Sequence, residues 1–425
     1  MEHRERSKSA FLHTKRLTRF WKKLGPGLIT GASDDDPSGI ATYSQAGARF
    51  GPQLLWTALA TYPLMVVVQE MSARIGLVTG RGLMGNIRLH YPRWVTALIL
   101  LVSFPAITLN IGADIAGMGA VVHMLAPEVP AFLASAATAV LLTITLVVWN
   151  YRRIATVLKW LCLVLFSYML IPFFTDTDWT EALLRTLVPS IAFTPEYFLA
   201  LVGILGTTIS PYLFFWQASM EVEEVQQRHL VVDKRIMRAM ETDVRGGLLL
   251  TNVVFYFIIL ATGTTLFNAG VHDITTVEEA ATALRPLAGD LSYALFACGI
   301  IGTGLLAIPV LAGSLSYMLA ETFGWQQGLD RKFHEAKGFY LTMIVSIAVG
   351  LSIDYLEVSP IKALLWTAVG YGLTAPVLIA IILHLCNQPG ILGDQVNGRW
   401  SNAIGILTLL LMTAAAVVML VLGLR

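Results

Sequence analysis

Apolar residues occur along this chain in long runs that short polar connections separate. A transmembrane helix needs about 20 mostly apolar residues to cross the hydrocarbon core of a bilayer. Runs of that kind predict eleven spans, near 25–47, 52–73, 95–123, 131–150, 154–174, 197–220, 246–268, 290–320, 339–356, 361–385 and 401–423. None of the connections is long enough for a soluble domain. The pattern therefore predicts one all-α transmembrane domain over 25–425, preceded by a polar, basic segment at 1–24.

Composition agrees with a membrane protein and narrows the classes of partner. Of the 425 residues 56% are hydrophobic and 13% are charged, whereas a soluble domain carries about a quarter charged residues. The 29 Lys and Arg nearly balance 28 Asp and Glu, so no overall field indicates a nucleic-acid partner. The three cysteines lie in apolar stretches, which argues against a disulfide framework. The expected partners are the lipid bilayer and small solutes.

The basic residues predict the orientation of the chain, because Lys and Arg accumulate in cytoplasmic connections. When the connections are assigned to alternate sides, 23 Lys and Arg lie on the side of the N-terminal segment and five lie on the other. The remaining base, Lys159, lies inside a span. We therefore expect a multi-pass protein of the plasma membrane with a cytoplasmic N-terminus, a cytoplasmic tail at 1–24 rather than a signal peptide, and a C-terminus outside.

Two spans differ from ordinary lipid-facing helices. The first contains Asp34, Asp35 and Asp36 followed by Pro37, with glycines on either side. One carboxylate at mid-membrane costs about 2.5–3.5 kcal/mol even on the lenient insertion scale. Backbone that Pro and Gly free from helical pairing is tolerated at that depth only inside protein or beside a cavity. The sixth span also carries a proline, Pro211, among small and hydroxylated residues. Both spans are predicted to be broken helices, although a simple kink at either proline is the alternative.

The two breaks occupy corresponding positions in two halves of the chain. Pro37 and Pro211 are separated by 174 residues and by five spans. Interrupted helices in matching positions indicate an inverted-repeat transporter with its substrate between the breaks near the membrane midplane. The prediction is a five-plus-five arrangement with repeat one at about 25–174, repeat two at about 197–385 and an extra helix at about 401–423.

The acids at the first break are the primary candidates for substrate binding. Three carboxylates need water, a cation or basic partners, and Lys159 is the one basic residue expected inside a span, so a cation is the natural occupant. Asp36 is the predicted ligand. Since neighbours on a helix point about 100° apart, the three acids cannot all line one wall. Asp34 and Asp35 are candidates for the ion or proton pathway, and the alternative is that one of them caps the second half-helix or pairs with Lys159.

Further candidates lie in other spans. Thr207 and Ser210 at the second break are expected to offer hydroxyl or carbonyl oxygens, with bonding back to the preceding turn as the alternative. Asp114 in the third span is functional by default at that depth, or else pairs with a hydroxyl of a neighbouring helix. Asn110 shares its helical face. Thr374, with Tyr371, is a candidate for the pathway in the tenth span.

Several short motifs lie in the first six predicted spans. They are Gly25-Pro26-Gly27, Asp36-Pro37, Gln45-Ala46-Gly47-Ala48, Leu54-Leu55-Trp56, Ala73 to Gly80 and Ser210-Pro211-Tyr212. Together they resemble the Nramp family of divalent metal transporters, with Ser210-Pro211-Tyr212 in the place of the family's Met-Pro-His. The resemblance is strongest over 25–88, is recognisable through 220 and is weak beyond. It implies an eleven- or twelve-helix, LeuT-like fold.

By this resemblance Asp36 is the metal-binding carboxylate, but four other functional positions depart from the family. Gly39 replaces an Asn, Ser210 a thioether ligand, and Tyr212 a His. Gly117 stands in place of the Glu that follows Asp114 in the family's Asp-x-x-Glu. The chain keeps the surrounding family motifs but differs at these functional positions. In this it is similar to the Nramp-related magnesium transporters.

These departures predict which ion is carried. Sulfur ligands favour softer metals, whereas oxygen ligands suit Mg²⁺ and Mn²⁺, and Mg²⁺ keeps several waters when it binds. Gly39 and Ser210 also remove side-chain volume, so a wider, all-oxygen cavity is expected. The prediction is import of Mg²⁺ and/or Mn²⁺ as substrate, with no cofactor. Loss of the His and Glu predicts transport without tight proton coupling, although Asp34, Asp35 or Asp114 can still carry protons.

Other function classes remain open at this stage. The first is a proton-coupled Mn²⁺/Fe²⁺ symporter, and the second is a sodium/amino-acid symporter of the same fold, whose substrate carboxylate the acids at the break would repel. A channel more often shows rings or repeated filter segments. Nothing resembles a nucleophile–base pair, so the chain is not expected to be an enzyme.

Overall fold

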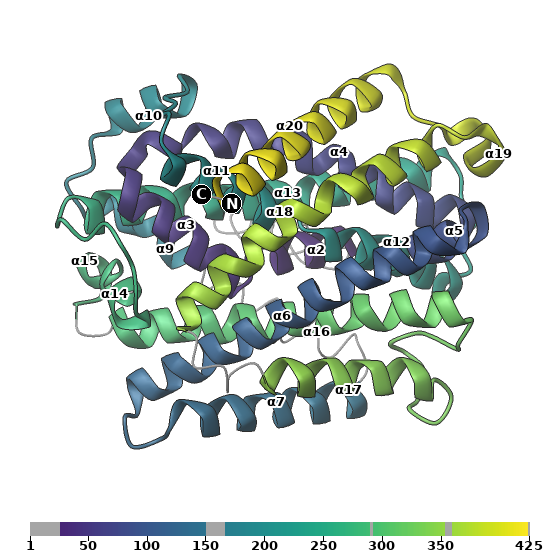
Figure 1. The fold of residues 1–425 in the computed structure, drawn as a ribbon, viewed down its shortest axis with the longest axis horizontal. Helices are drawn as coiled ribbons and strands as arrows, with labels where there is room; N and C mark the ends of the chain where they lie inside the picture. The colour runs from purple at the N-terminus through teal and green to yellow at the C-terminus, as the bar shows by residue number, and fades with distance from the viewer. Residues whose placement is uncertain (1–25, 150–165, 290–291, 353–358, 424–425) are drawn as a thin grey trace, which may run out of the picture.

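The computed structural model describes residues 26–149, 166–289, 292–352 and 359–423, and within these ranges the secondary structure is helical with no β-strand. The helices pack into one bundle, with the broken helices in its middle (Figure 1). The α-helices are α2 (Pro26–Asp34), α3 (Pro37–Phe50), α4 (Trp56–Thr79), α5 (Leu83–His90), α6 (Arg93–Leu125), α7 (Ala131–Val148), α9 (Phe166–Leu170), α10 (Trp179–Leu187), α11 (Pro195–Thr208), α12 (Pro211–Arg228), α13 (Lys234–Thr262), α14 (Val277–Thr282), α15 (Arg285–Ala288), α16 (Ser292–Phe323), α17 (Lys337–Ser352), α18 (Pro360–Cys386), α19 (Pro389–Leu392) and α20 (Arg399–Gly423). Short 3₁₀ or π segments occur at η1 (Gly51–Leu54), η3 (Ile171–Phe173), η4 (Gly263–Phe267) and η7 (Gly393–Gln395).

Both predicted breaks are confirmed, and each lies directly before a proline. Asp36 has an extended backbone (φ −69°, ψ 171°) and is the N-cap of α3, whose first residue is Pro37. Ser210 has a similar extended backbone (φ −74°, ψ 122°) between α11 and α12, and Pro211 begins α12. Proline is costly inside a helix because it lacks the N–H and clashes with the preceding turn, but its fixed φ suits the first helical position. Each proline therefore ends one half-helix and starts the next.

The four half-helices pack against one another and against the helices around them. Helix α2 packs against α13, α3 against α13 and α18, α11 against α3 and α18, and α12 against α4 and α16. The long helices α6 and α16 pack together beside this centre, and α7 and α17 lie side by side at the edge of the molecule (Figure 1). The breaks are thus enclosed by other helices.

Glycines allow the half-helices to approach their neighbours closely. A Cβ on Gly31 of α2 would lie 2.4 Å from the carbonyl oxygen of Gly247 in α13. A Cβ on Gly206 of α11 would lie 1.9 Å from the carbonyl oxygen of Ala368 in α18. Small residues at such contacts let helix backbones touch, and here they hold both broken helices against continuous ones.

The number of membrane spans stays a prediction. Within the described ranges seven helices are individually long and apolar enough to cross a membrane, and the pair Pro37–Leu54 and Trp56–Thr79, bent by 110°, passes together. Helix α17 is a shorter apolar helix. Most of the predicted span 154–174, including Lys159, lies outside the described residues, as does the predicted tail at 1–24.

Candidate metal site between the broken helices

The carboxylate of Asp36 is held at the first break by two hydrogen bonds. Its Oδ1 accepts from the backbone N of Gly39 at 2.7 Å, which caps α3. Its Oδ2 accepts from Nδ2 of Asn110 in α6 at 2.9 Å. Asp36 is 2% exposed. The carboxylate is therefore fixed in position by the start of α3 and by α6.

Asn110 brings a second buried acid to the same place. Its Nδ2 lies 3.4 Å from Oδ2 of Asp114, one turn further along α6. Oδ1 of Asn110 and Oδ1 of Asp114 are buried and have no hydrogen-bond partner among the described residues. Buried polar atoms without a partner are rare in proteins, and two acceptors of this kind beside Asp36 are suited to a cation or its water.

The other two acids of the first break, beside Asp36 in the sequence, are also buried. Asp34 ends α2 and Asp35 lies in the break, and both are buried. Each has an Oδ1 without a hydrogen-bond partner in the described part of the chain. No three His, Cys, Asp or Glu side chains among the described residues are placed to hold one metal ion. In this arrangement a metal ion at the break would meet at most two such side chains of the described residues.

The second break lies against the first. The Ser210 hydroxyl donates to the carbonyl oxygen of Thr207 at 2.7 Å, which is the back-bonding alternative for that hydroxyl. A Cβ on Gly39 would lie 3.4 Å from Oγ1 of Thr207, 3.3 Å from the ring of Tyr43 and 3.2 Å from the carbonyl oxygen of Asp34. The space beside Gly39, expected to be part of a wider cavity, is therefore closed by its neighbours in this arrangement.

Tyr212 joins the two broken helices. It is the second residue of the half-helix α12, and its hydroxyl donates to the carbonyl oxygen of Ser33 in α2 at 2.8 Å. Its ring packs against that of Tyr371 with centroids 5.7 Å apart. Tyr212, in the position of the family's His, thus connects the Ser33 carbonyl near the first break with Tyr371 in the tenth predicted span.

Helix α18 carries the two predicted candidates Thr374 and Tyr371 and a further polar residue that lies against α3. Thr374 is half-buried and its hydroxyl donates to the carbonyl oxygen of Tyr371 in its own helix at 3.2 Å. Thr367, one turn before Tyr371, instead pairs with the hydroxyl of Ser38 in α3 at 3.0 Å. Neither Thr367 nor Ser38 was predicted from the sequence. The spacing of four residues between Thr367 and Tyr371 was the signal that places both on one helical face.

A polar chain continues from the break along α2 and α12. The hydroxyl of Thr30 in α2 donates to Oε1 of Gln217 in α12 at 2.5 Å, and Nε2 of Gln217 donates to Oε1 of Glu221 at 2.8 Å. Glu221 is 4% exposed. It lies inside α12, which continues through Arg228. These residues also escaped the sequence analysis, since Glu221 follows the apolar run that predicted the sixth span.

An ion pair connects α4 to α13 beside α2. The guanidinium Nε of Arg245 lies 2.5 Å from Oε1 of the buried Glu70. Glu241, one turn before Arg245, lies 3.9 Å from it and 3.9 Å from Arg74 of α4. This network joins α4, which packs against α12, to α13, which packs against α2 and α3. The two joined helices are far apart in the sequence.

Comparison with known proteins gives the family. The family model described as "Natural resistance-associated macrophage protein-like" (Nramp) matches residues 27–422. A divalent metal cation transporter, MntH of Chromohalobacter salexigens, is 26% identical over 412 residues, covering 93% of this chain and 90% of the relative.

Two solved structures show the same fold. The structure of the Eremococcus coleocola manganese transporter superposes with a TM-score of 0.74 at 21% identity, covering 94% of this chain and 87% of that one. The structure of MhsT in complex with L-phenylalanine superposes with a TM-score of 0.62 at 13% identity, covering 94% and 98%. These similarities confirm the predicted LeuT-like fold. With a family model that spans nearly its whole length, the chain belongs to the Nramp family of multi-pass membrane transporters.

Proposed function

We propose that this protein imports divalent metal ions, Mg²⁺ and/or Mn²⁺, through a site formed where its two broken helices meet. Asp36 is the principal ligand in this proposal. The names of the relatives, a divalent metal cation transporter and a manganese transporter, support the class of substrate.

The observation that carries the proposal is the setting of the Asp36 carboxylate. It is a buried acid held by one backbone N–H and one amide, and beside it Asn110 and Asp114 each have an acceptor oxygen without a hydrogen-bond partner among the described residues. Carboxylate, carbonyl and hydroxyl oxygens suit Mg²⁺ and Mn²⁺, whereas soft metals favour sulfur. Ser210 supplies oxygen where the family has a thioether, so the donor set supports a preference for hard ions.

Binding of a partly hydrated ion requires the breaks to separate. Thr207, Tyr43 and the Asp34 carbonyl pack within 3.2–3.4 Å of where a side chain on Gly39 would begin. Transporters of this class move one group of helices against another around a fixed midplane site. In our proposal the closed arrangement has no room for the water molecules that a metal ion carries. Movement of the neighbouring helices away from Gly39 provides that room.

We also propose that import is not tightly coupled to protons. The hydroxyl of Tyr212 is engaged by the Ser33 carbonyl. A Cβ on Gly117, where the family has Glu, would lie 3.4 Å from a methyl group of Leu364, which makes this an apolar contact. The two positions at which the family carries titratable groups therefore offer neither a free base nor a polar route.

The substrate is tested with the purified protein in liposomes. Entry of Mn²⁺ is measured with an enclosed indicator, and Mg²⁺, Ca²⁺ and Cd²⁺ are added as competitors. We expect Mg²⁺ to compete at concentrations comparable to Mn²⁺ and Asp36→Asn to abolish saturable entry. Binding of Cd²⁺ far more tightly than Mg²⁺ would argue for a soft site and overturn the ion assignment.

Coupling is tested in the same liposomes with an enclosed pH dye at two external pH values. We expect little acidification of the lumen during metal entry. Strict proton entry with each metal ion would refute the second proposal, and variants Asp34→Asn and Asp114→Asn would then identify which buried acid carries the proton.

A further inference from the structure

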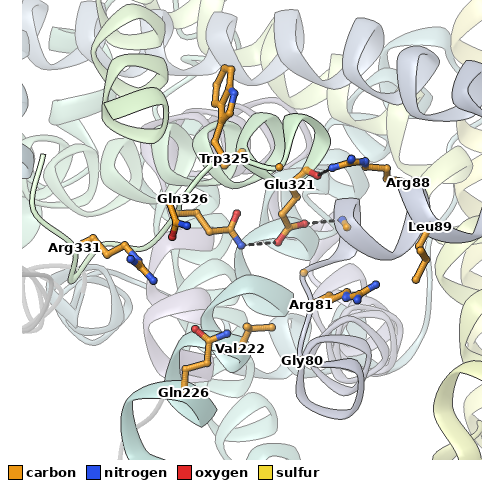
Figure 2. Close-up of a pocket in the computed structure, with 15 residues that line it drawn as sticks. Gly80, Arg81, Arg88, Leu89, Val222, Gln226, Glu321, Trp325, Gln326 and Arg331 are labelled. Carbon is orange, nitrogen blue, oxygen red and sulfur yellow. Dashed lines mark hydrogen bonds between the residues drawn. The ribbon is translucent and has the colours of Figure 1, made fainter. Parts of the chain in front are cut away.

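A cavity of about 530 Å³ lies away from the two breaks, at the ends of α4, α12 and α16. Figure 2 shows the side chains that line it. Its walls come from the α4–α5 connection, from α5, from the last turns of α12, and from the connection between α16 and α17. These connections carry basic residues that predict the cytoplasmic face. The volume is within the range of small-molecule sites, about 300–1,000 Å³.

The lining carries an excess of positive charge. It contains three arginines, Arg81, Arg88 and Arg331, and one acid, Glu321, for a formal charge of +2. None of the three arginines forms an ion pair within the described part of the chain. In Figure 2 Arg331 lies on one side of the view and Arg81 and Arg88 on the other. Arg331 also lies near the carboxylates of Glu223 and Glu335, but guanidinium groups that line a cavity without a close ion pair are suited to an anion.

The single acid is already engaged in the wall of the cavity. Glu321 accepts from the backbone N of Gly85 at 2.8 Å, from Oγ of Ser219 at 3.3 Å and from Nε2 of Gln327 at 3.4 Å. A Cβ on Gly82 would lie 1.9 Å from Oε1 of Glu321, so the acid packs directly on the α4–α5 connection. Glu321 therefore supports the cavity, and the arginines would repel a metal cation leaving by this route.

The geometry points to a binding site for a phosphate-bearing anion in this cavity, with Arg81 and Arg331 as its principal ligands. The planar fork of arginine matches phosphate oxygens with two parallel hydrogen bonds. Gln226 of α12 supplies a further polar group to the same cavity. The phosphate belongs either to a lipid headgroup or to a small soluble anion, because both present the same oxygens.

The surroundings of the cavity resemble a membrane interface. Leu89, Phe323 and Trp325 are 59%, 58% and 42% exposed, and the rings of Phe323 and Trp325 stack with centroids 5.1 Å apart. Exposed aromatic side chains gather at headgroup level. A lipid headgroup can therefore reach the arginines while its chains stay in the bilayer.

A bound anion would connect three segments that are distant in the sequence. Arg81 follows α4, Gln226 lies on the half-helix α12, and Arg331 lies in the α16–α17 connection. Since α12 is the continuation of the second break, an anion held between these groups is positioned to hold α12 against α16. This extends beyond metal transport, and its binding test does not depend on transport.

The test uses the full chain purified in neutral detergent and measures binding by calorimetry. The probes are inorganic phosphate, a short-chain phosphatidylglycerol and, as the zwitterionic comparison, a short-chain phosphatidylcholine. The double variant Arg81→Gln/Arg331→Gln is compared with Arg235→Gln/Arg238→Gln, which removes the same charge from exposed positions of α13.

We expect the wild type to bind phosphatidylglycerol or phosphate, and the cavity variant to lose about tenfold in affinity for each arginine removed. The α13 variant should bind like the wild type. Binding of phosphatidylglycerol alone identifies a lipid headgroup, whereas phosphate that displaces it identifies a soluble anion. The proposal is overturned if the wild type binds neither probe, or if both double variants lose affinity equally.

A conservative variant distinguishes loss of the anion contact from a folding defect in the double variant. Arg331→Lys keeps the charge but removes the guanidinium fork. We expect it to unfold at the wild-type temperature and to bind the anion several-fold more weakly. Unchanged affinity in Arg331→Lys would contradict an arginine–phosphate contact.

Discussion

Asp36 has two roles in the structure that substitutions can separate. Its carboxylate caps α3 through the backbone N of Gly39, and it is the proposed metal ligand. Asp36→Asn keeps a side-chain oxygen for the cap but removes the charge. Asp36→Ala removes both. The two variants should therefore be equally inactive but differ in stability.

The magnitudes follow from the hydrogen bonds of Asp36. In Asp36→Asn the new amide meets Nδ2 of Asn110, but Oδ1 of Asn110 has no hydrogen-bond partner among the described residues, so a turn of that amide restores a bond. The cost should stay below about 1 kcal/mol. In Asp36→Ala the lost cap costs about 0.5–2 kcal/mol and the unpaired amide of Asn110 about 1–3 kcal/mol. Both variants should lose at least 10–100-fold in metal affinity, the loss typical of removing even an outer partner of a metal site.

Thermal unfolding in detergent and metal uptake in liposomes measure the two effects independently. We expect Asp36→Asn to unfold close to the wild-type temperature and Asp36→Ala several degrees lower, with neither showing saturable Mn²⁺ or Mg²⁺ entry. Uptake by Asp36→Asn within about threefold of the wild type would refute the ligand role. Equal stability of the two variants would refute the capping role.

Three further substitutions test the contacts around the site. Gly206→Ala forces a methyl group against the carbonyl oxygen of Ala368, 1.9 Å away, and should destabilise the protein by about 1–3 kcal/mol in thermal unfolding. Arg245→Gln leaves the buried carboxylate of Glu70 with a weaker partner, and should lower stability by about 1–2 kcal/mol because the arginine is itself half exposed. Tyr212→Phe removes a buried hydrogen bond and should lower the unfolding temperature, a loss of about 1–3 kcal/mol, while the pH profile of uptake stays unchanged.

Matched controls come from the same helices. A Cβ on Gly370 of α18 meets nothing within 4 Å, so Gly370→Ala should leave the unfolding temperature unchanged, and equal losses in both glycine variants would contradict the packing explanation. Arg235→Gln removes a charge from an exposed position of α13 and should be neutral. If it matched Arg245→Gln, the Glu70 ion pair would not be the cause. A shifted pH profile in Tyr212→Phe would show that its hydroxyl takes part in proton movement.

Local features of the sequence predicted the helices and the breaks. Hydropathy reports the preference of each segment for lipid, and Pro37 and Pro211 act on the backbone immediately before them. Both breaks consequently lie where the sequence predicted them. Asp36 could also be identified from the sequence, because a buried carboxylate beside a proline break is costly wherever the rest of the chain lies.

The sequence by itself therefore determined that this is a helical membrane protein with two central breaks and an acid at the first of them. Only the tertiary structure decided the partners of that acid. Asn110 reaches Asp36 across 74 residues of sequence, and Tyr212 reaches Ser33 across 179. Such contacts depend on how helices cross, which is set by small residues such as Gly31 and by packing over their whole length. The arginine-lined cavity likewise comes from the ends of helices that are distant in the chain, so no local pattern reveals it.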